Sequence, residues 1–208
     1  MAGRRRVTRE AIVEHARRVV ADRGAGALTF QALAAALGVS KQAIIYWYPS
    51  KWELIRDSSL PALKAEADTI IRAVALARTA PEAIERCIRA LVAHHLADLG
   101  SFRMLYLAPQ FDERASLADP EADAEILVPI HQTTSAMYAA LEARLAADSA
   151  FCRGENPRRL AVAVHMAGIG LLTMVALADS VDDPLAHGTD ALVGALIVLL
   201  TAGQTAAQ

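Results

Sequence analysis

Side chains that can read DNA gather between residues 29 and 51. Lys41 and Gln42 follow Ser40 directly, and both are long enough to reach base edges. Glutamine binds adenine through two hydrogen bonds, and lysine binds the O6 and N7 atoms of guanine. Ala43 offers its methyl group to the methyl group of thymine. These residue types, placed side by side, indicate contact with the bases of double-stranded DNA.

Residues around this pair are suited to the phosphate backbone. We expect Thr29, Lys51 and the hydroxyl of Tyr46 to contact phosphates, and the indole N–H of Trp47 is a further donor. Trp47 has a second interpretation as part of a small hydrophobic core, and Tyr48 is assigned to that core. The first turn of a helix beginning at Ser40 adds free N–H groups and a positive dipole end, which favour phosphate.

Helix start and stop signals place these residues on a helix-turn-helix. Three helices are expected, each beginning at a threonine or serine cap and ending at a glycine or proline. They run from Thr8 to Gly24, from Thr29 to Gly38, and from Ser40 to Pro49. The third helix, from Ser40 to Trp47, is about 12 Å long at 1.5 Å per residue. That length matches a major groove about 12 Å wide. The last two helices and their glycine turn form the helix-turn-helix.

Residues 28–51 resemble the DNA-binding domain of the TetR family of bacterial repressors. The matching features are a Leu-Thr start, the turn Leu-Gly-Val-Ser at 37–40, the aromatic cluster at 46–48 and the closing Pro-Ser-Lys at 49–51. The resemblance implies a homodimer with one helix-turn-helix per subunit and a larger helical domain that binds a small ligand and dimerises. Ile45 departs from the family pattern, which usually has a tyrosine whose hydroxyl supports a phosphate contact.

The charge distribution agrees with a DNA-reading amino-terminal region. The 208 residues carry a formal net charge of −2. Residues 1–51 hold nine basic and three acidic residues, net +6, whereas the remainder holds 12 basic and 20 acidic residues, net −8. The basic head favours a polyanion, although a solvated charged face would show the same pattern. Arg4, Arg5, Arg6 and Arg9 either enter the minor groove as an arm or only raise nonspecific affinity.

Composition predicts an all-α fold in two domains. Hydrophobic residues make up 54% of the chain and aromatic residues 5%, so the apolar content is mainly alanine, leucine, valine and isoleucine. No strand-type alternation appears, and alanine and leucine favour helices. We expect a helix-turn-helix domain over 1–50 and a helical ligand-binding and dimerisation domain over 51–208. Two distant cysteines and no apolar leader favour a cytoplasmic protein.

Helices are expected over most of the second domain. Their ranges are 50–78, 79–98, 101–106, 121–148 and 157–178, and a loop is expected over 108–120. A last helix opens near Asp183-Pro184 and is clearest over 189–201.

Residues 160–178 carry no charge and are long enough to span a membrane. A membrane-tethered regulator is therefore an alternative. We prefer a dimer through the last two helices, with a seam of Leu160, Val164, Gly168, Leu171 and Val175 on one helix and Leu192, Leu196 and Leu199 on the other.

A ligand pocket is expected among the middle helices. Apolar walls with a few hydroxyl and imidazole groups suit a mostly hydrophobic small molecule. The candidate lining residues are Phe102, Met104, Tyr106, Phe111, His131, Thr134, Tyr138 and His165. For any single one of them, ordinary core packing is the favoured interpretation. His131 and His165 are the stronger candidates, because a buried imidazole requires a partner.

No catalytic or metal-binding motif is found. The adjacent His94 and His95 point about 100° apart on a helix and have no His-x-x-x-His partner. We expect no enzyme activity, no cofactor and no metal.

Taken together, the sequence predicts a ligand-responsive transcriptional regulator. Such a regulator is usually a repressor in the TetR family, and we expect a small, mostly hydrophobic effector to release it from a palindromic operator. The alternative is a helical small-molecule-binding or enzymatic protein whose basic head is incidental.

Overall fold

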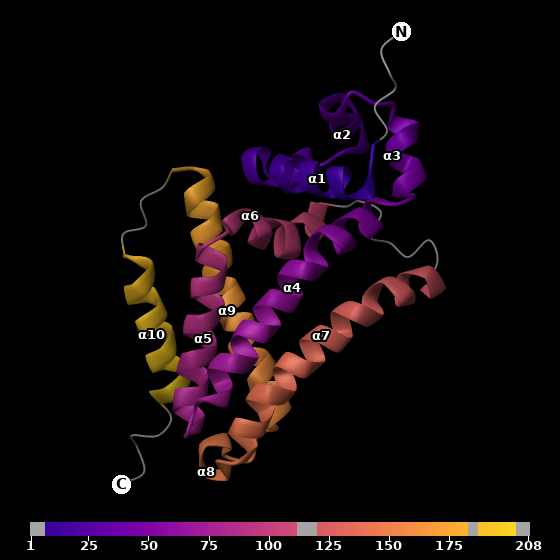
Figure 1. Cartoon of the computed structure of the whole chain (residues 1–208). Coiled ribbons are helices and arrows are strands. Elements are labelled where there is room, and N and C mark those ends of the chain that lie inside the picture. The colour runs from indigo at the N-terminus through magenta and orange to yellow at the C-terminus, as the bar shows by residue number, and fades with distance from the viewer. Residues whose placement is uncertain (1–6, 112–119, 183–186, 203–208) are drawn as a thin grey trace. The chain divides into compact units, whose positions relative to one another are not determined.

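The computed structural model of the chain describes residues 7–111, 120–182 and 187–202, without the side chains of residues 110, 111 and 120–126. Within these ranges every regular element is helical and none is a strand (Figure 1). The predicted all-α fold is therefore confirmed. The chain divides into two compact units, the first made of residues 1–64 and 98–131 and the second of 65–97 and 132–208.

The first unit contains the three predicted short helices. They are α1 (Arg9–Arg23), α2 (Phe30–Leu37) and α3 (Lys41–Trp47), and the first residues of α4 (Lys51–Ala75) follow them. The predicted caps are confirmed, since the hydroxyl oxygens of Thr8, Thr29 and Ser40 each accept a hydrogen bond from a backbone N–H three residues later. A short α6 (Leu99–Phe102), a π-helical turn (Arg103–Leu107) and a 3₁₀ turn (Ala108–Phe111) complete this unit.

The core of the first unit holds α3 in place. Ile12, Leu33, Ile44 and Tyr48 are fully buried in one apolar cluster that also includes Met104. Between α2 and α3, Gly38 adopts the left-handed conformation with φ of 67°, which a residue with a Cβ atom rarely takes. The tight turn at Gly38 therefore fixes the angle between the two helices of the motif.

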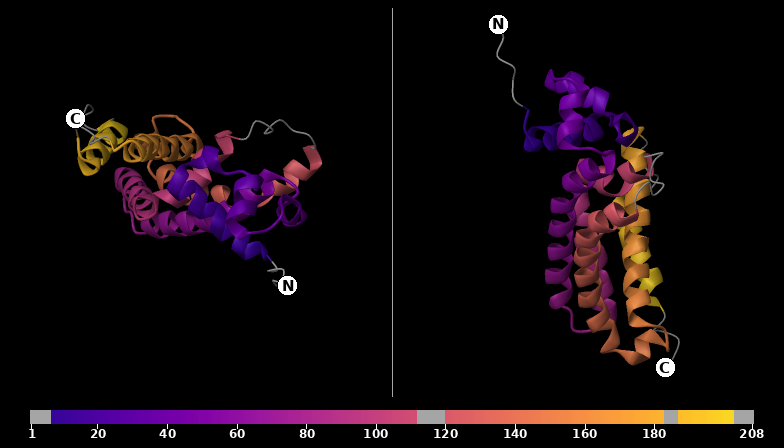
Figure 2. Two further views of the ribbon diagram at one scale, coloured as in Figure 1. Left: turned by 90° about the horizontal axis from the view of Figure 1, so that it is seen from above. Right: turned by 90° about the vertical axis from the view of Figure 1, so that its right-hand side faces the viewer.

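The second unit is a bundle of longer helices. It contains the end of α4, α5 (Ala80–Leu96), the end of α7 (Pro120–Ala146), α8 (Ser149–Cys152), α9 (Pro157–Ser180) and α10 (Thr189–Thr201). Helices α5, α9 and α10 pack against one another, as both views of Figure 2 show. Thr79 caps α5 and Asn156 caps α9, as their sequences predict.

Some boundaries differ from the sequence prediction. Helix α4 ends at Ala75 and continues through Pro61, and the short helix α8 was not predicted. A four-residue helix has too few positions to show a periodic pattern, which explains why α8 escaped notice. Asp183 and Pro184, expected to open the last helix, lie outside the described residues.

The predicted dimer seam on α9 is wrong in its direction. Val164, Gly168 and Val175 are buried, and α9 packs with this side against α5. A Cβ atom on Gly168 would lie 2.5 Å from Cδ2 of Leu91 and 3.2 Å from Cδ1 of Ile88, so glycine permits the close approach of the two helices. Because α9 is apolar on nearly all sides, its sequence does not show which side faces its own subunit.

Helix α9 is also the described helix that is long and apolar enough to cross a membrane. It qualifies by length and composition only, and 39% of its most apolar 18-residue stretch is buried within the chain. The core helix of a globular bundle has the same properties.

Candidate nucleic-acid interface and buried polar site

Helix α3 presents a polar surface on an apolar anchor. Ser40 caps the helix by accepting a 3.2 Å hydrogen bond from the N–H of Ala43. Lys41 and Gln42 in the first turn are exposed, whereas Ile44 on the opposite side is fully buried. The buried side fixes the helix, and the exposed side leaves the two candidate base-reading side chains accessible.

The aromatic residues at the end of α3 divide between surface and core. Tyr46 is 79% exposed, and its ring meets the Trp47 ring edge to face with centroids 5.5 Å apart. Trp47 is half-buried and packs against the apolar cluster of the first unit. Tyr48 is fully buried, which confirms its assignment to the core. Trp47 therefore combines partial core packing with an accessible edge.

An ion-pair network connects α1 to the beginning of α4. The Nε atom of Arg9 donates to the hydroxyl of Tyr48 at 3.1 Å and to Asp57 at 2.9 Å. Arg56 also pairs with Asp57, at 2.7 Å. Hydrogen bonding to Tyr48 raises the pKa of Arg9, despite partial desolvation, so this guanidinium stays charged. Nearby, Arg17 donates twice to the carbonyl oxygen of Ser58, at 3.0 and 2.7 Å.

The network changes the role expected for Arg9. The sequence placed Arg9 with Arg4, Arg5 and Arg6, either in a DNA-binding arm or as a source of nonspecific affinity alone. Arg9 lies instead in the first turn of α1 and is occupied by Asp57 and Tyr48. Arg4, Arg5 and Arg6 lie outside the described residues.

The second unit contains a buried polar cluster, called here the Glu66 cluster and made of Glu66, His95, Tyr138 and His165. Glu66 on α4 is 0% exposed, and its two carboxylate oxygens lie 2.8 Å from Nε2 of His95 and 2.9 Å from Nε2 of His165. The second ring nitrogen of His165, Nδ1, lies 2.9 Å from the hydroxyl of Tyr138. Four helices, α4, α5, α7 and α9, thus contribute one side chain each.

The electrostatics of the Glu66 cluster keep the carboxylate ionised. Burial alone would raise the pKa of Glu66, but hydrogen bonds from His165 and His95 outweigh burial and lower the pKa to about 2. Burial, with a smaller effect of the Glu66 charge, raises the pKa of the Cys87 thiol to about 12. The cluster therefore holds an anionic carboxylate, and the nearby Cys87 thiol stays protonated.

Part of the first unit matches a known family of DNA-binding domains. Residues 12–57 match the family model described as bacterial regulatory proteins, tetR family. This match includes the helix-turn-helix, its buried anchor residues and Asp57. Residues 12–57 are therefore a DNA-binding domain of the TetR type.

Solved structures show the same fold over nearly the whole chain. A TetR-family regulatory protein from Rhodococcus RHA1 has a TM-score of 0.64 at 20% identity, covering 93% of this chain and 95% of that one. The regulator FadR from Bacillus subtilis, solved with stearoyl-CoA, has a TM-score of 0.66 at 15% identity, covering 94% and 99%. A transcriptional regulator from Saccharomonospora viridis, solved with choline, has a TM-score of 0.61 at 19% identity, covering 90% and 92%. No curated protein is significantly similar in sequence.

The remaining predicted DNA contacts lie mostly at helix ends. Thr29 is exposed at the start of α2, and its hydroxyl accepts from the N–H of Ala32 at 3.0 Å. Lys51 is the first residue of α4 and is half-buried, as is Ile45 in α3. Ile45 has no polar atom in its side chain, so Tyr46 carries the hydroxyl nearest to the expected family position.

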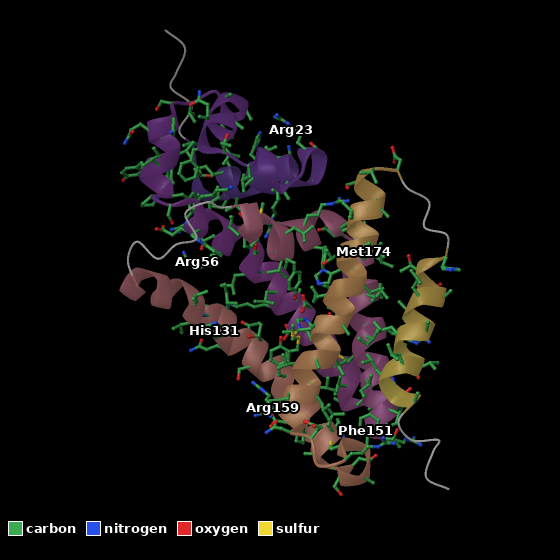
Figure 3. The ribbon with its side chains drawn as sticks, turned by 180° about the vertical axis from the view of Figure 1, so that it is seen from behind. Arg23, Arg56, His131, Phe151, Arg159 and Met174 are labelled. Carbon is green, nitrogen blue, oxygen red and sulfur yellow. The ribbon has the colours of Figure 1, made fainter. Side chains whose placement is uncertain are left out.

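The predicted ligand-binding residues are distributed over both units. Tyr138 and His165 meet in the Glu66 cluster, and Thr134 lies one turn before Tyr138 on α7. In the first unit, Phe102 and Met104 are buried, and the rings of Phe102 and Tyr106 have centroids 5.2 Å apart. His131 is exposed on α7 (Figure 3). The side chain of Phe111 lies outside the described part of the chain.

Sequence reasoning missed Glu66. Buried residues of α4 recur at helical spacing, as Leu63, Ala67, Ile70 and Val74, and Glu66 falls within this apolar stripe. A carboxylate on the apolar side of a helix requires a partner, and this was the available signal. His95 is buried on α5, and its partner was not predicted either.

Two further features bear on function. No group of three or more histidine, cysteine or acidic residues among the described residues is arranged to hold a metal ion. Large apolar side chains are exposed on the two carboxy-terminal helices, at Met166, Met174, Leu177, Val198 and Leu199. Met174, labelled in Figure 3, is 58% exposed on α9.

Proposed function

We propose that this protein is a TetR-family regulator that acts as a homodimeric, ligand-responsive repressor and binds a palindromic operator through α3. The observation that carries the proposal is the exposed pair Lys41 and Gln42 on a short helix whose opposite side is fixed by Ile44. An exposed pair of this kind can read base edges in a major groove. The protein acts by binding and release of DNA rather than by catalysis.

The proposed DNA contacts fall into two groups. Lys41, Gln42 and Ala43 contact bases, and the free N–H groups of the first turn after Ser40 favour phosphate. Thr29, Tyr46, Trp47 and Lys51 contact the phosphate backbone. The high exposure of Tyr46 supports this division, because a buried tyrosine could not reach DNA.

The exposed apolar residues of α9 and α10 support dimerisation through these helices. An isologous interface pairs the same surface patch on both subunits, and exposed methionine, leucine and valine side chains are suited to its centre. Such a dimer in the cytoplasm places two recognition helices about 34–36 Å apart, in successive major grooves.

The second unit is proposed to bind the effector. Two solved structures of the same fold contain small molecules, stearoyl-CoA in one and choline in the other. An effector releases the operator only if it binds more tightly to the DNA-incompetent dimer geometry. Helix α4 contributes residues to both units and provides a continuous connection for that change.

Selection of bound sequences from a random DNA pool tests the proposal. We expect a palindrome with half-sites separated by about one helical turn. The variant with Lys41→Ala and Gln42→Ala should lose this preference, because each base contact contributes about 1–3 kcal/mol of discrimination. Circular dichroism should show the variant to be folded, since both side chains are exposed. Selection of no common sequence, or the same palindrome with the double variant, contradicts the proposal.

A further inference from the structure

The Glu66 cluster extends from a fully buried carboxylate to a partly buried tyrosine. Glu66, His95 and His165 are buried, and Tyr138 is only partly buried. Among the described residues, the Tyr138 hydroxyl has one hydrogen bond, to Nδ1 of His165 at 2.9 Å. Tyr138 is therefore the member of the cluster that a molecule entering the second unit can reach.

The hydrogen bonds of the cluster have a definite direction. An ionised carboxylate can only accept hydrogen bonds, so Nε2 of His95 and Nε2 of His165 must both donate to Glu66. A neutral imidazole with its hydrogen on Nε2 has a lone pair on Nδ1. Nδ1 of His165 then accepts from the Tyr138 hydroxyl, and the tyrosine oxygen has only lone pairs left for another partner.

The position of Tyr138 is held from both sides. Its ring meets the His165 ring edge to face, with centroids 5.5 Å apart. The guanidinium of Arg158 lies 5.3 Å from the centre of the Tyr138 ring and is itself bound by Ser135 and Glu142. Burial raises the pKa of Tyr138, and the charge of Glu66 raises it further, so the hydroxyl retains its proton.

Stability alone does not account for a cluster of this composition. A buried ion pair or charged network is often no more stable than apolar side chains of similar volume. Four helices nevertheless supply polar groups here, and the hydrogen bonds lead from Glu66 to Tyr138, the one member of the cluster that is not buried. An arrangement of this kind is typical of a site that orients a bound molecule.

We propose that the Tyr138 hydroxyl is the polar contact of the effector and that Glu66 and His165 hold it as a hydrogen-bond acceptor. The effector is then a mostly apolar molecule whose end group donates a hydrogen bond, as an alcohol or an amine does. A carboxylate is disfavoured, because it would meet the lone pairs of Tyr138 with the Glu66 charge behind them. Glu66 and His165 are positioning residues in this arrangement. The inference rests on the proposed effector-binding role of the second unit.

The hydrogen-bond direction can be tested without knowing the effector. Imidazole ¹⁵N spectra of the full-length protein, labelled at histidine, report which ring nitrogen carries a proton. We expect His165 at neutral pH to be protonated on Nε2 and unprotonated on Nδ1, and Tyr138→Phe should shift the Nδ1 signal. Thr173→Val is the matched control, because the Thr173 hydroxyl donates to Ile169 within α9. A protonated Nδ1 on His165 would overturn the proposal.

The end-group preference is tested with molecules that share one apolar chain. 1-Decanol, decylamine, decyltrimethylammonium and decanoic acid differ in donor ability and charge, and binding is measured by calorimetry. We expect 1-decanol and decylamine to bind more tightly than decanoic acid, and Tyr138→Phe to weaken them about tenfold, as for the loss of one buried hydrogen bond. Tighter binding of decyltrimethylammonium than of decylamine would indicate recognition of charge and contradict the proposal.

Two results separate this inference from the proposed function. If neither donor probe binds more tightly than decanoic acid, or if Tyr138→Phe binds them as wild type does, the end-group assignment is wrong. Operator selection with the wild-type protein is independent of Tyr138. A palindrome recovered in that experiment would leave the repressor assignment intact while the effector class is rejected.

Discussion

Glu66 is the residue whose environment has the largest consequence for stability. Its carboxylate is buried and accepts from two imidazoles, and the pKa falls from 4.5 to about 2. When folding lowers the pKa of a carboxyl group, the ionised group stabilises the native state at pH values above its pKa in the unfolded chain. For Glu66 this contribution is lost as the pH falls from 4.5 through 2. The acid stability of the chain is therefore tied to one side chain that the DNA interface does not use.

Glu66→Gln tests this dependence. The side-chain NH₂ group of glutamine cannot accept a hydrogen bond, so one imidazole N–H loses its acceptor, and we expect the free energy of unfolding at neutral pH to fall by about 1–3 kcal/mol. The difference from wild type should shrink below pH 4.5. Glu85→Gln is the control, because its exposed pair with Arg89 contributes about 0–1 kcal/mol. Urea unfolding at several pH values gives the comparison, and equal stability of wild type and Glu66→Gln at neutral pH would contradict it.

Among the elements, the contact of α5 with α9 depends on a single glycine. A methyl group at Gly168 would lie 2.5 Å from Cδ2 of Leu91, so Leu91 must move within a filled core. We expect Gly168→Ala to lower the free energy of unfolding by about 1–3 kcal/mol. Leu91→Ala removes the conflicting atoms, so the double variant should be less destabilised than the sum of the two single variants. Additive effects in denaturant unfolding would show that the two residues do not conflict.

Elements with clear start and stop signals could be predicted from the sequence, and contacts between distant elements could not. The caps at Thr29 and Ser40 and the turn at Gly38 define α2 and α3 locally, because each interaction spans only a few residues. The Glu66 cluster joins four helices whose residues are up to 99 positions apart. Periodicity shows that a position is buried, but it does not show which partner it meets.

At the scale of the whole molecule, the proposed function requires two copies of the recognition helix. Met174 is 58% exposed and Leu199 is 75% exposed, both on helices that also pack within the subunit. Membrane insertion of α9 is the competing use of such a surface. A dimer interface predicts a defined stoichiometry in detergent-free buffer, whereas membrane insertion predicts partitioning into vesicles.

Met174→Lys tests the dimer directly. In an isologous interface both subunits carry the substitution, so two lysines enter the same contact. Loss of a central contact lowers the binding free energy by about 2 kcal/mol or more. We expect the variant to sediment as a folded monomer at concentrations where wild type is dimeric. Its affinity for the palindrome should then fall toward that for a single half-site, since one recognition helix binds one major groove.

Leu76→Lys is the matched control, because Leu76 is 67% exposed but lies outside α9 and α10. An unchanged dimer with Met174→Lys, or a monomer with Leu76→Lys, would move the interface to another surface.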